Sequence, residues 1–452
     1  MAPKIRWIRT CVILTFTACF MLLCMAGPAG AVDEKMLERM EQIIKQQQAQ
    51  IEAQAKALEK LQQQVEALSE KAVQEATEAA KAEVAKASVP PDVLRTKGGD
   101  KVSVQLYGQV NRAFLAADDG DSSDYYFVDN DNSSSRIGLI GESKVNDDIT
   151  IGTRMEFEYQ SNPSNLVNQD DKNPDGGDGT GFDERWVDAQ FTSKRFGKLY
   201  LGKGSTASDG TSEVDLSGTD VVGYSGLTDM AGGINWYDDN TNGFIANGGR
   251  SLRIGDVFTN FDGLSRRNRI RYDSPNFWGF TLSGSALSDG GDVALRYAAN
   301  WGENWKFAAA AAYANPRAVS DTIDNQYNGS ASILHSSGIN LTVAAGTGDL
   351  ESGLTNPDNS KRDDDPMFYY AKVGYRAKWF EFGETRFSLD YSRSDDVFQD
   401  GDEAKTVGFQ FVQDFPEWGS EYYLGYRWHE LDRSTEDFND INALMTGVRV
   451  KF

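Results

Sequence analysis

The chain has 452 residues, a formal net charge of −23, 11 prolines and two histidines. A chain this acidic is not expected to bind nucleic acid, because DNA- and RNA-binding domains normally present a basic surface. Its three cysteines, Cys11, Cys19 and Cys24, all lie in the first segment, so the remainder of the chain cannot depend on disulfide bonds for its stability.

The first segment, residues 1–31, has the pattern of a secretory signal peptide. Three basic residues precede a short apolar run that ends in Pro28 and in the small residues Ala29, Gly30 and Ala31, an arrangement typical of a cleavage site. We expect cleavage after Ala31, which changes the formal net charge from −23 to −26. No apolar stretch long enough for a transmembrane helix follows, but a membrane barrel, whose strands alternate apolar and polar residues, would not produce one.

Residues 32–90 are low in glycine and proline and carry an apolar residue every seven positions. These positions are Leu37, Ile44, Ile51, Leu58, Val65 and Ala72. Heptad repeats sustained over this length are typical of a coiled coil, and we expect a trimeric one that stands in the periplasm. Pro90 and Pro91 end the helix, and residues 91–101 form a polar linker.

From residue 102 to residue 452 the pattern changes to alternation with a period of two, which predicts β-strands. We count about 16 strands, an even number, as single-chain membrane barrels require. Short turns, such as 146–148, alternate with long polar connections, such as 118–132. One rim of short turns and one rim of long acidic loops is typical of outer-membrane barrels. The predicted fold class is therefore an all-β transmembrane barrel with an N-terminal α-helical coiled coil.

One connection is much longer than the others. Residues 204–265 are rich in glycine, aspartate, serine and asparagine, and a structureless connection of this length inside a compact domain is usually functional. We expect this constriction loop to fold into the lumen of the barrel.

Several stretches resemble the Gram-negative trimeric porins, namely VSVQLYGQVNRAF, SSRIGLIGESKVNDDITIGTRMEFE, KLYLGKGS, IRYDSPNFWGFTLSGSA and the ending TGVRVKF. The resemblance covers residues 102–452 and implies a homotrimer surrounded by outer-membrane lipid and lipopolysaccharide. It also implies that the barrel-assembly machinery reads the terminal aromatic residue, and that the third long loop narrows the pore. A coiled coil ahead of the barrel is similar to the DcaP-like porins, which are associated with small anions such as dicarboxylates. Phosphate-selective porins carry such stalks too.

Strand alternation predicts a basic pore wall. Arg267, Arg269 and Arg271 share one strand face, opposite apolar residues, so we expect them to face the lumen. The predicted pore-lining bases are Arg136, Arg154, Arg185, Arg267, Arg269, Arg271, Arg296 and Lys372. Arg185 is included because its motif, ERWVDAQF, resembles that of a porin pore-wall arginine. Strict alternation points Arg185 outward, as it does Arg112, and a β-bulge would turn either residue inward.

The constriction loop carries the opposite charge. Asp209, Glu213, Asp215 and Asp220 are the acidic residues predicted to face the basic wall. Acids on the loop and bases on the wall would create a transverse field, which the low-dielectric walls concentrate. The wall would then favour anions despite the acidic overall charge. A single inward arginine could alternatively be paired with a neighbouring carboxylate such as Glu156, which would neutralise it.

No enzymatic motif, cofactor site or metal site is predicted. The two histidines are His335 and His429, and no nucleophile stands in a motif with either of them, as a hydrolase would require. The acidic segments 118–131 and 170–183 lack the spacing of a defined calcium motif, so solvated surface loops are the simpler interpretation.

The predicted function is an outer-membrane porin for passive diffusion of small hydrophilic solutes, with a preference for small anions such as dicarboxylates. Two channel alternatives stay open, a non-selective diffusion porin and a phosphate-type porin. An alternative of another class is a structural tether, in which the coiled coil links the outer membrane to the cell wall. Deleting residues 33–88 separates these functions, because a porin would keep its conductance.

Overall fold

A computed structural model describes residues 102–452, except 177–178 and 318. The predicted signal peptide, coiled coil and linker lie outside the described residues. Within the described range, no helix is long and apolar enough to cross a membrane.

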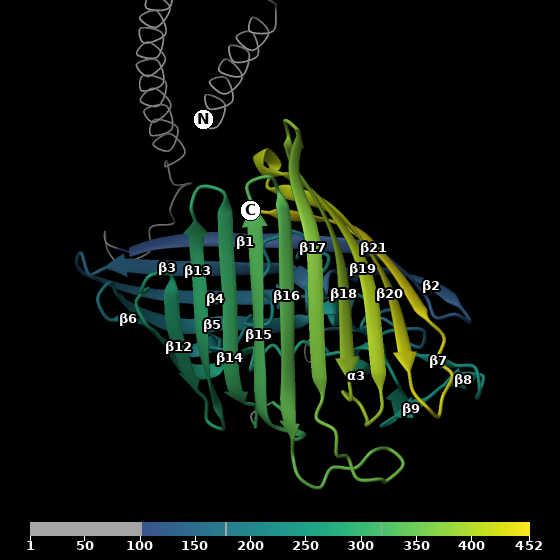
Figure 1. Cartoon of the computed structure of the whole chain (residues 1–452). Coiled ribbons are helices and arrows are strands. Elements are labelled where there is room, and N and C mark those ends of the chain that lie inside the picture. The colour runs from purple at the N-terminus through teal and green to yellow at the C-terminus, as the bar shows by residue number, and fades with distance from the viewer. Residues whose placement is uncertain (1–101, 177–178, 318) are drawn as a thin grey trace, which may run out of the picture. The chain divides into compact units, whose positions relative to one another are not determined.

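The described residues form one closed antiparallel barrel (Figure 1). Its strands are β1 (Val102–Asp118), β2 (Ser123–Asp129), β3 (Arg136–Lys144), β4 (Ile149–Tyr159), β5 (Phe182–Ser193), β6 (Gly197–Ser205), β11 (Arg266–Asp273), β12 (Phe280–Ala286), β13 (Gly291–Trp301), β14 (Trp305–Asn315), β15 (Ile323–His335), β16 (Ile339–Leu350), β17 (Met367–Phe380), β18 (Gly383–Asp395), β19 (Glu403–Phe415), β20 (Ser420–Asp432) and β21 (Ile441–Lys451). Successive strands pair with each other, except that β2 and β3 both pair with β1, and β21 returns to pair with β1 and closes the ring. In Figure 1, β13 to β20 form the near wall, and β1 and β3–β6 cross behind them.

Two of the seventeen strands share one position in the ring. The first half of β1 pairs with β3, and its second half pairs with β2. The short helix η1 (Asp131–Ser133) lies between β2 and β3 in the chain and interrupts their pairing with β1. The barrel therefore has sixteen strand positions, which confirms the predicted count.

The predicted loop 118–132 is wrong in its middle, because Ser123–Asp129 is a strand. Tyr125 and Phe127 point outward, whereas Tyr126 and Val128 are buried inside the barrel. This alternation has a period of two, but the neighbouring aspartates and serines made the segment look like an acidic loop. The connection that remains between β1 and β2 is only 119–122.

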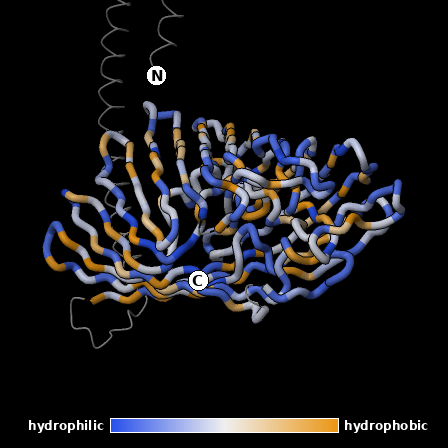
Figure 2. The backbone as a smooth tube through the Cα atoms, turned by 90° about the horizontal axis from the view of Figure 1, so that it is seen from below, coloured by the Kyte–Doolittle hydropathy of each residue, from blue (hydrophilic) through white to orange (hydrophobic). Residues whose placement is uncertain are grey.

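The outer face of the barrel is apolar. Along β17, Tyr369 and Val373 are about half exposed, with fractions of 49% and 52%, whereas Phe368 and Tyr370, on either side of Tyr369, are buried. Hydrophobic and hydrophilic residues alternate in the same way along the other strands (Figure 2). Apolar side chains that point outward from a closed ring are suited to contact lipid.

Residues 206–265, which connect β6 to β11, are called the inner loop below. Most of them lie inside the barrel, whereas residues 239–251 are largely exposed beside the connection between β20 and β21. The inner loop contains η2 (Leu227–Asp229), β7 (Tyr237–Asp238), β8 (Gly243–Phe244), β9 (Ala246–Asn247), β10 (Arg250–Ser251) and α3 (Ile254–Val257). Ile234, Trp236 and Ile254 are fully buried and belong to the same apolar core as Leu115 and Tyr423 of the barrel wall. These apolar residues are scattered singly through a polar sequence, so the loop showed no apolar run. Its core packs the loop against the wall and leaves a cavity elsewhere in the lumen.

Candidate functional site: a cavity between the inner loop and the barrel wall

A cavity of about 670 Å³, called the loop cavity below, separates the inner loop from the wall formed by β3–β6 and β11. The basic side chains that line it are Arg136, Arg185, Lys203, Arg266 and Arg267, all on the wall. The acidic side chains that the inner loop contributes are Asp209, Glu213, Asp220, Asp229 and Asp262. Among the charged side chains, the inner loop therefore contributes only acids, whereas the wall contributes all the bases together with Asp131, Glu158, Asp183 and Glu184.

Arg185 reaches the cavity through a β-bulge. The register between β4 and β5 shifts after Glu156, which pairs with Trp186, to Phe157, which pairs with Glu184. Arg185 is the extra residue, so its guanidinium turns inward and donates to Glu156 (Nε to Oε1, 2.8 Å). Arg112 has no such bulge, because β1 and β2 pair without interruption from Arg112 onward. It points outward and forms an ion pair with Asp129.

Glu156 neutralises much of the basic wall. Its carboxylate is buried and lies 2.6 Å from Arg154 Nη2, 2.8 Å from Arg185 Nε and 3.8 Å from Arg136 Nη1. Tyr107 donates a further hydrogen bond to it (2.6 Å). Arg154 also stacks on Trp186, with 3.9 Å from the guanidinium carbon to the ring centroid. Arg154 is thus held to the wall and does not line the cavity.

The expected row of three water-facing arginines is not formed. Arg269 points into the barrel but is only 4% exposed, because it pairs with Asp188 (2.9 Å) and donates to the carbonyl of Gly202 (2.6 Å). Arg271 donates to Asp273 (2.8 Å) and to the carbonyl of Thr206 (2.7 Å). The expectation that Arg269 faces water is therefore wrong. Thr206, at the start of the inner loop, covers this strand face at Arg271.

Arg267 and its neighbour Arg266 both reach the cavity. Arg267 is exposed, and no ion pair or hydrogen bond of its side chain, or of Arg266, is found among the described residues. Arg266 lies 5.3 Å from the Trp186 ring centroid. Strict alternation points Arg266 outward, so no sequence signal identified it. Arg266 is the first residue of β11, where the alternation of side chains along the strand has only begun.

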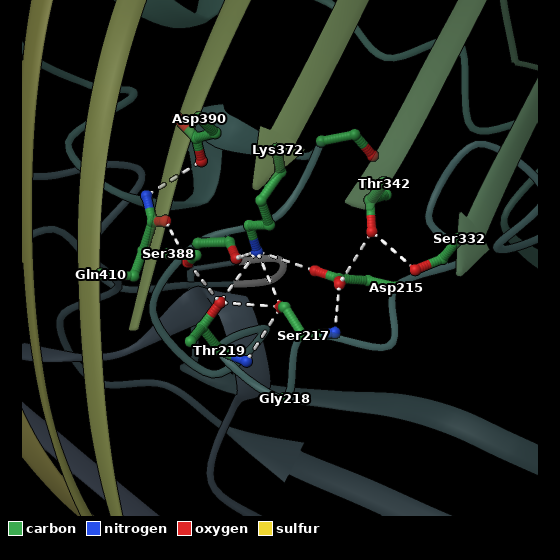
Figure 3. A network of polar contacts seen from close by, with 12 residues as sticks. Asp215, Ser217, Gly218, Thr219, Ser332, Thr342, Lys372, Ser388, Asp390 and Gln410 are labelled. Atoms are coloured by element: carbon green, nitrogen blue, oxygen red, sulfur yellow. Dashed lines mark hydrogen bonds and ion pairs between the residues drawn. The ribbon is translucent and has the colours of Figure 1, made fainter. Parts of the chain in front are cut away.

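Lys372 and Arg296 are bound to the inner loop instead of lining the cavity. Lys372 is buried and forms an ion pair with Asp215 (Nζ to Oδ2, 2.7 Å) (Figure 3). Asp215, predicted to face the basic wall across the pore, is thus also removed from the cavity. Arg296 donates to the main-chain carbonyl of Asp209 (2.7 Å). Inward orientation was predicted correctly for Lys372, but the loop lies directly on it.

Burial raises the pKa of three carboxyl groups that the inner loop contributes to the cavity, Glu213, Asp229 and Asp262. Burial, and next the charge of Asp209, raise the pKa of Glu213 to about 7. Burial and the neighbouring Glu213 raise the pKa of Asp262 well above its ordinary value. Burial and Asp131 do the same to the pKa of Asp229. Asp229 and Asp262 were not predicted to line the cavity, because the way the loop folds decides which carboxyl groups lie beside them.

No group of three or more His, Cys, Asp or Glu side chains in the described part of the chain is placed to hold a metal ion. His335 is the last residue of β15 and lies beside Trp305. His429 is buried against Phe258, with 5.5 Å between the ring centroids. The two histidines belong to separate parts of the barrel.

Comparison with known proteins places the chain in a family. Residues 75–433 match the family described as Gram-negative porin. Outer membrane porin C of Serratia marcescens is 25% identical over 385 residues, which cover 78% of this chain and 91% of that protein. The solved anion-selective porin from Comamonas acidovorans has a TM-score of 0.50 at 15% identity, covering 78% of this chain and all of that one.

The outer membrane protein OmpT of Vibrio cholerae gives the same TM-score at 14% identity, covering 80% of this chain and all of that one. The outer membrane channel DcaP of Acinetobacter baumannii gives a TM-score of 0.48 at 12% identity, covering 80% and 99%. Likenesses at this level concern the fold and do not distinguish one porin subfamily from another. The chain belongs to the Gram-negative porins, and it is an outer-membrane channel rather than an enzyme.

Proposed function

We propose that small hydrophilic solutes diffuse through the loop cavity and that the channel weakly favours anions, dicarboxylates among them. The observation that carries this proposal is the pair Arg266 and Arg267, which line the cavity without an ion-pair partner among the described residues. The other basic groups that line the cavity are paired, Arg136 and Arg185 with Glu156 and Lys203 with Asp183. Arginine stays charged at any physiological pH and can bind a carboxylate through two hydrogen bonds.

The acidic groups of the cavity favour a second candidate, a diffusion channel without selectivity. Nine carboxyl groups and five basic groups line the cavity. Glu158 and Arg185 are paired with each other, and burial raises the pKa of the loop residues Asp229 and Asp262, which disfavours their charged forms. The positive and negative charges in the cavity are therefore close to balance, and the preference for anions should be small.

We further propose a homotrimer in contact with outer-membrane lipid and lipopolysaccharide, assembled by the barrel-assembly machinery, with residues 32–90 as a periplasmic stalk of the DcaP-like kind. The heptad repeat and membership of the porin family support this arrangement. Phosphate-type selectivity and a tethering role for the stalk are the alternatives that the sequence leaves open.

The decisive experiment is the double substitution Arg266→Ala/Arg267→Ala in a planar bilayer with a KCl gradient. The reversal potential should move towards cations, and liposome uptake of succinate should fall more than uptake of a neutral solute of the same size. Arg317→Ala is the matched control, because Arg317 is exposed, paired with Asp324 and outside the cavity. An unchanged reversal potential in the double variant would contradict the anion preference.

A further inference from the structure

The side chain of Lys372, on β17, is fully buried against the inner loop (Figure 3). Its ammonium donates to Asp215 Oδ2 (2.7 Å), Thr219 Oγ1 (2.9 Å) and the carbonyl of Gly223 (2.7 Å). A fourth acceptor, Ser217 Oγ, lies at 3.2 Å. We call this set of residues the loop latch. One cation of the wall thus binds four points on nine consecutive residues of the loop.

The neighbouring strands hold the same segment. Thr342, on β16, donates to Asp215 Oδ1 (3.2 Å). Thr219 Oγ1 and Ser388 Oγ, on β18, lie 2.7 Å apart. These hydrogen bonds bring no positive charge to the segment. Lys372 supplies the charge that the buried Asp215 carboxylate requires.

The loop latch lies next to two acids of the cavity. Glu213 precedes Asp215 by two residues, and Asp220 directly follows Thr219. Both Glu213 and Asp220 line the cavity opposite the arginines. Any displacement of the latched segment therefore moves both acids and changes the width of the passage.

We infer that Lys372 is a positioning residue of this channel. It holds residues 215–223 to the wall through Asp215, and so sets both the width of the passage and the distance of Glu213 and Asp220 from Arg266 and Arg267. The inference rests on the proposed passage of solutes through the loop cavity.

The test is Lys372→Met, compared with the full-length chain in single-channel recordings. Without the ammonium, the buried Asp215 carboxylate has no counter-ion and the segment should leave the wall. Single-channel conductance should become larger and spread over many levels, and the reversal potential should lose its dependence on Arg266 and Arg267. Lys372→Met/Asp215→Asn removes both charges together, so it should assemble even where the single variant does not, and it should show the same spread. Lys405→Met is the matched control, because Lys405 pairs with Asp432 on the neighbouring strand and does not contact the loop.

A cross-link separates positioning from general stability. Thr219→Cys/Ser388→Cys, introduced into Lys372→Met, places two thiols where two hydroxyls lie 2.7 Å apart. The only natural cysteines lie in residues 1–24, so no other thiol competes once the predicted signal peptide is removed. Oxidation should restore uniform conductance and the original reversal potential, and reduction should abolish both.

The outcomes are distinguishable. A wild-type barrel that conducts no ions would overturn the proposed function and the inference together. A wild type that conducts, with Lys372→Met or the charge-free double variant identical to it, would overturn only the role of Lys372. An oxidised cross-link that fails to restore uniform conductance would do the same.

Discussion

The protonation of Glu213 should make the selectivity of this channel depend on pH. Burial and Asp209 raise the pKa of Glu213 to about 7, whereas Arg266 acts in the opposite direction. With this pKa, roughly one tenth of the side chains are ionised at pH 6 and roughly nine tenths at pH 8. Almost one full negative charge therefore appears in the loop cavity over this interval, opposite the two unpaired arginines.

The sign follows from the direction of the shift. Folding raises the pKa of Glu213 from its ordinary 4.5 to about 7, so the docking of the loop is strongest below pH 4.5. It weakens as the pH rises from there through 7, because the carboxylate forms later in the folded loop than in the free chain. The reversal potential measured in a KCl gradient should accordingly move towards cations between pH 6 and pH 8.

Glu213→Gln should abolish this change, because the amide does not titrate. Glu417→Gln serves as the matched control, since Glu417 is exposed in the turn between β19 and β20, outside the cavity. A wild-type reversal potential that is equal at pH 6 and pH 8, or a Glu213→Gln channel that still shows the shift, would refute the reasoning.

Two further predictions concern the wall and the loop core. Glu156→Gln leaves Arg136, Arg154 and Arg185 without their shared counter-ion, and the loss of a buried partner costs about 3–5 kcal/mol. The midpoint of urea unfolding in detergent should therefore fall. An unchanged midpoint would show that Glu158 alone is enough to neutralise these arginines. Trp236→Ala removes a fully buried side chain from the core of the inner loop, at a cost of about 3–5 kcal/mol, and should raise the channel conductance while the barrel stays folded. Trp236→Phe is its control, because the indole N–H has no hydrogen-bond partner among the described residues; equal conductance in both variants would contradict a packing role.

Much of the barrel is determined by the sequence alone, because strand alternation is a local property. Side chains on a strand point to opposite faces in turn, so the sixteen strand positions and the inward orientation of Lys372 and Arg269 could be predicted from their neighbours. The segment Ser123–Asp129 was missed although it alternates, because acidic residues on both sides resemble an outer loop.

Only the tertiary structure decides which inward side chains meet water. The inner loop buries Lys372 and Asp215 against each other, and Asp188, two strands away, pairs with Arg269, whereas Arg267 stays exposed. The bulge at Arg185 depends in the same way on the pairing of two strands, since the extra residue is defined only by the partner. The pairing and burial of the carboxyl groups at Glu213, Asp229 and Asp262 arise when the loop folds back on itself. Orientation is set within a strand, but burial, pairing and charge are set by segments far apart in the chain, whose packing no local pattern records.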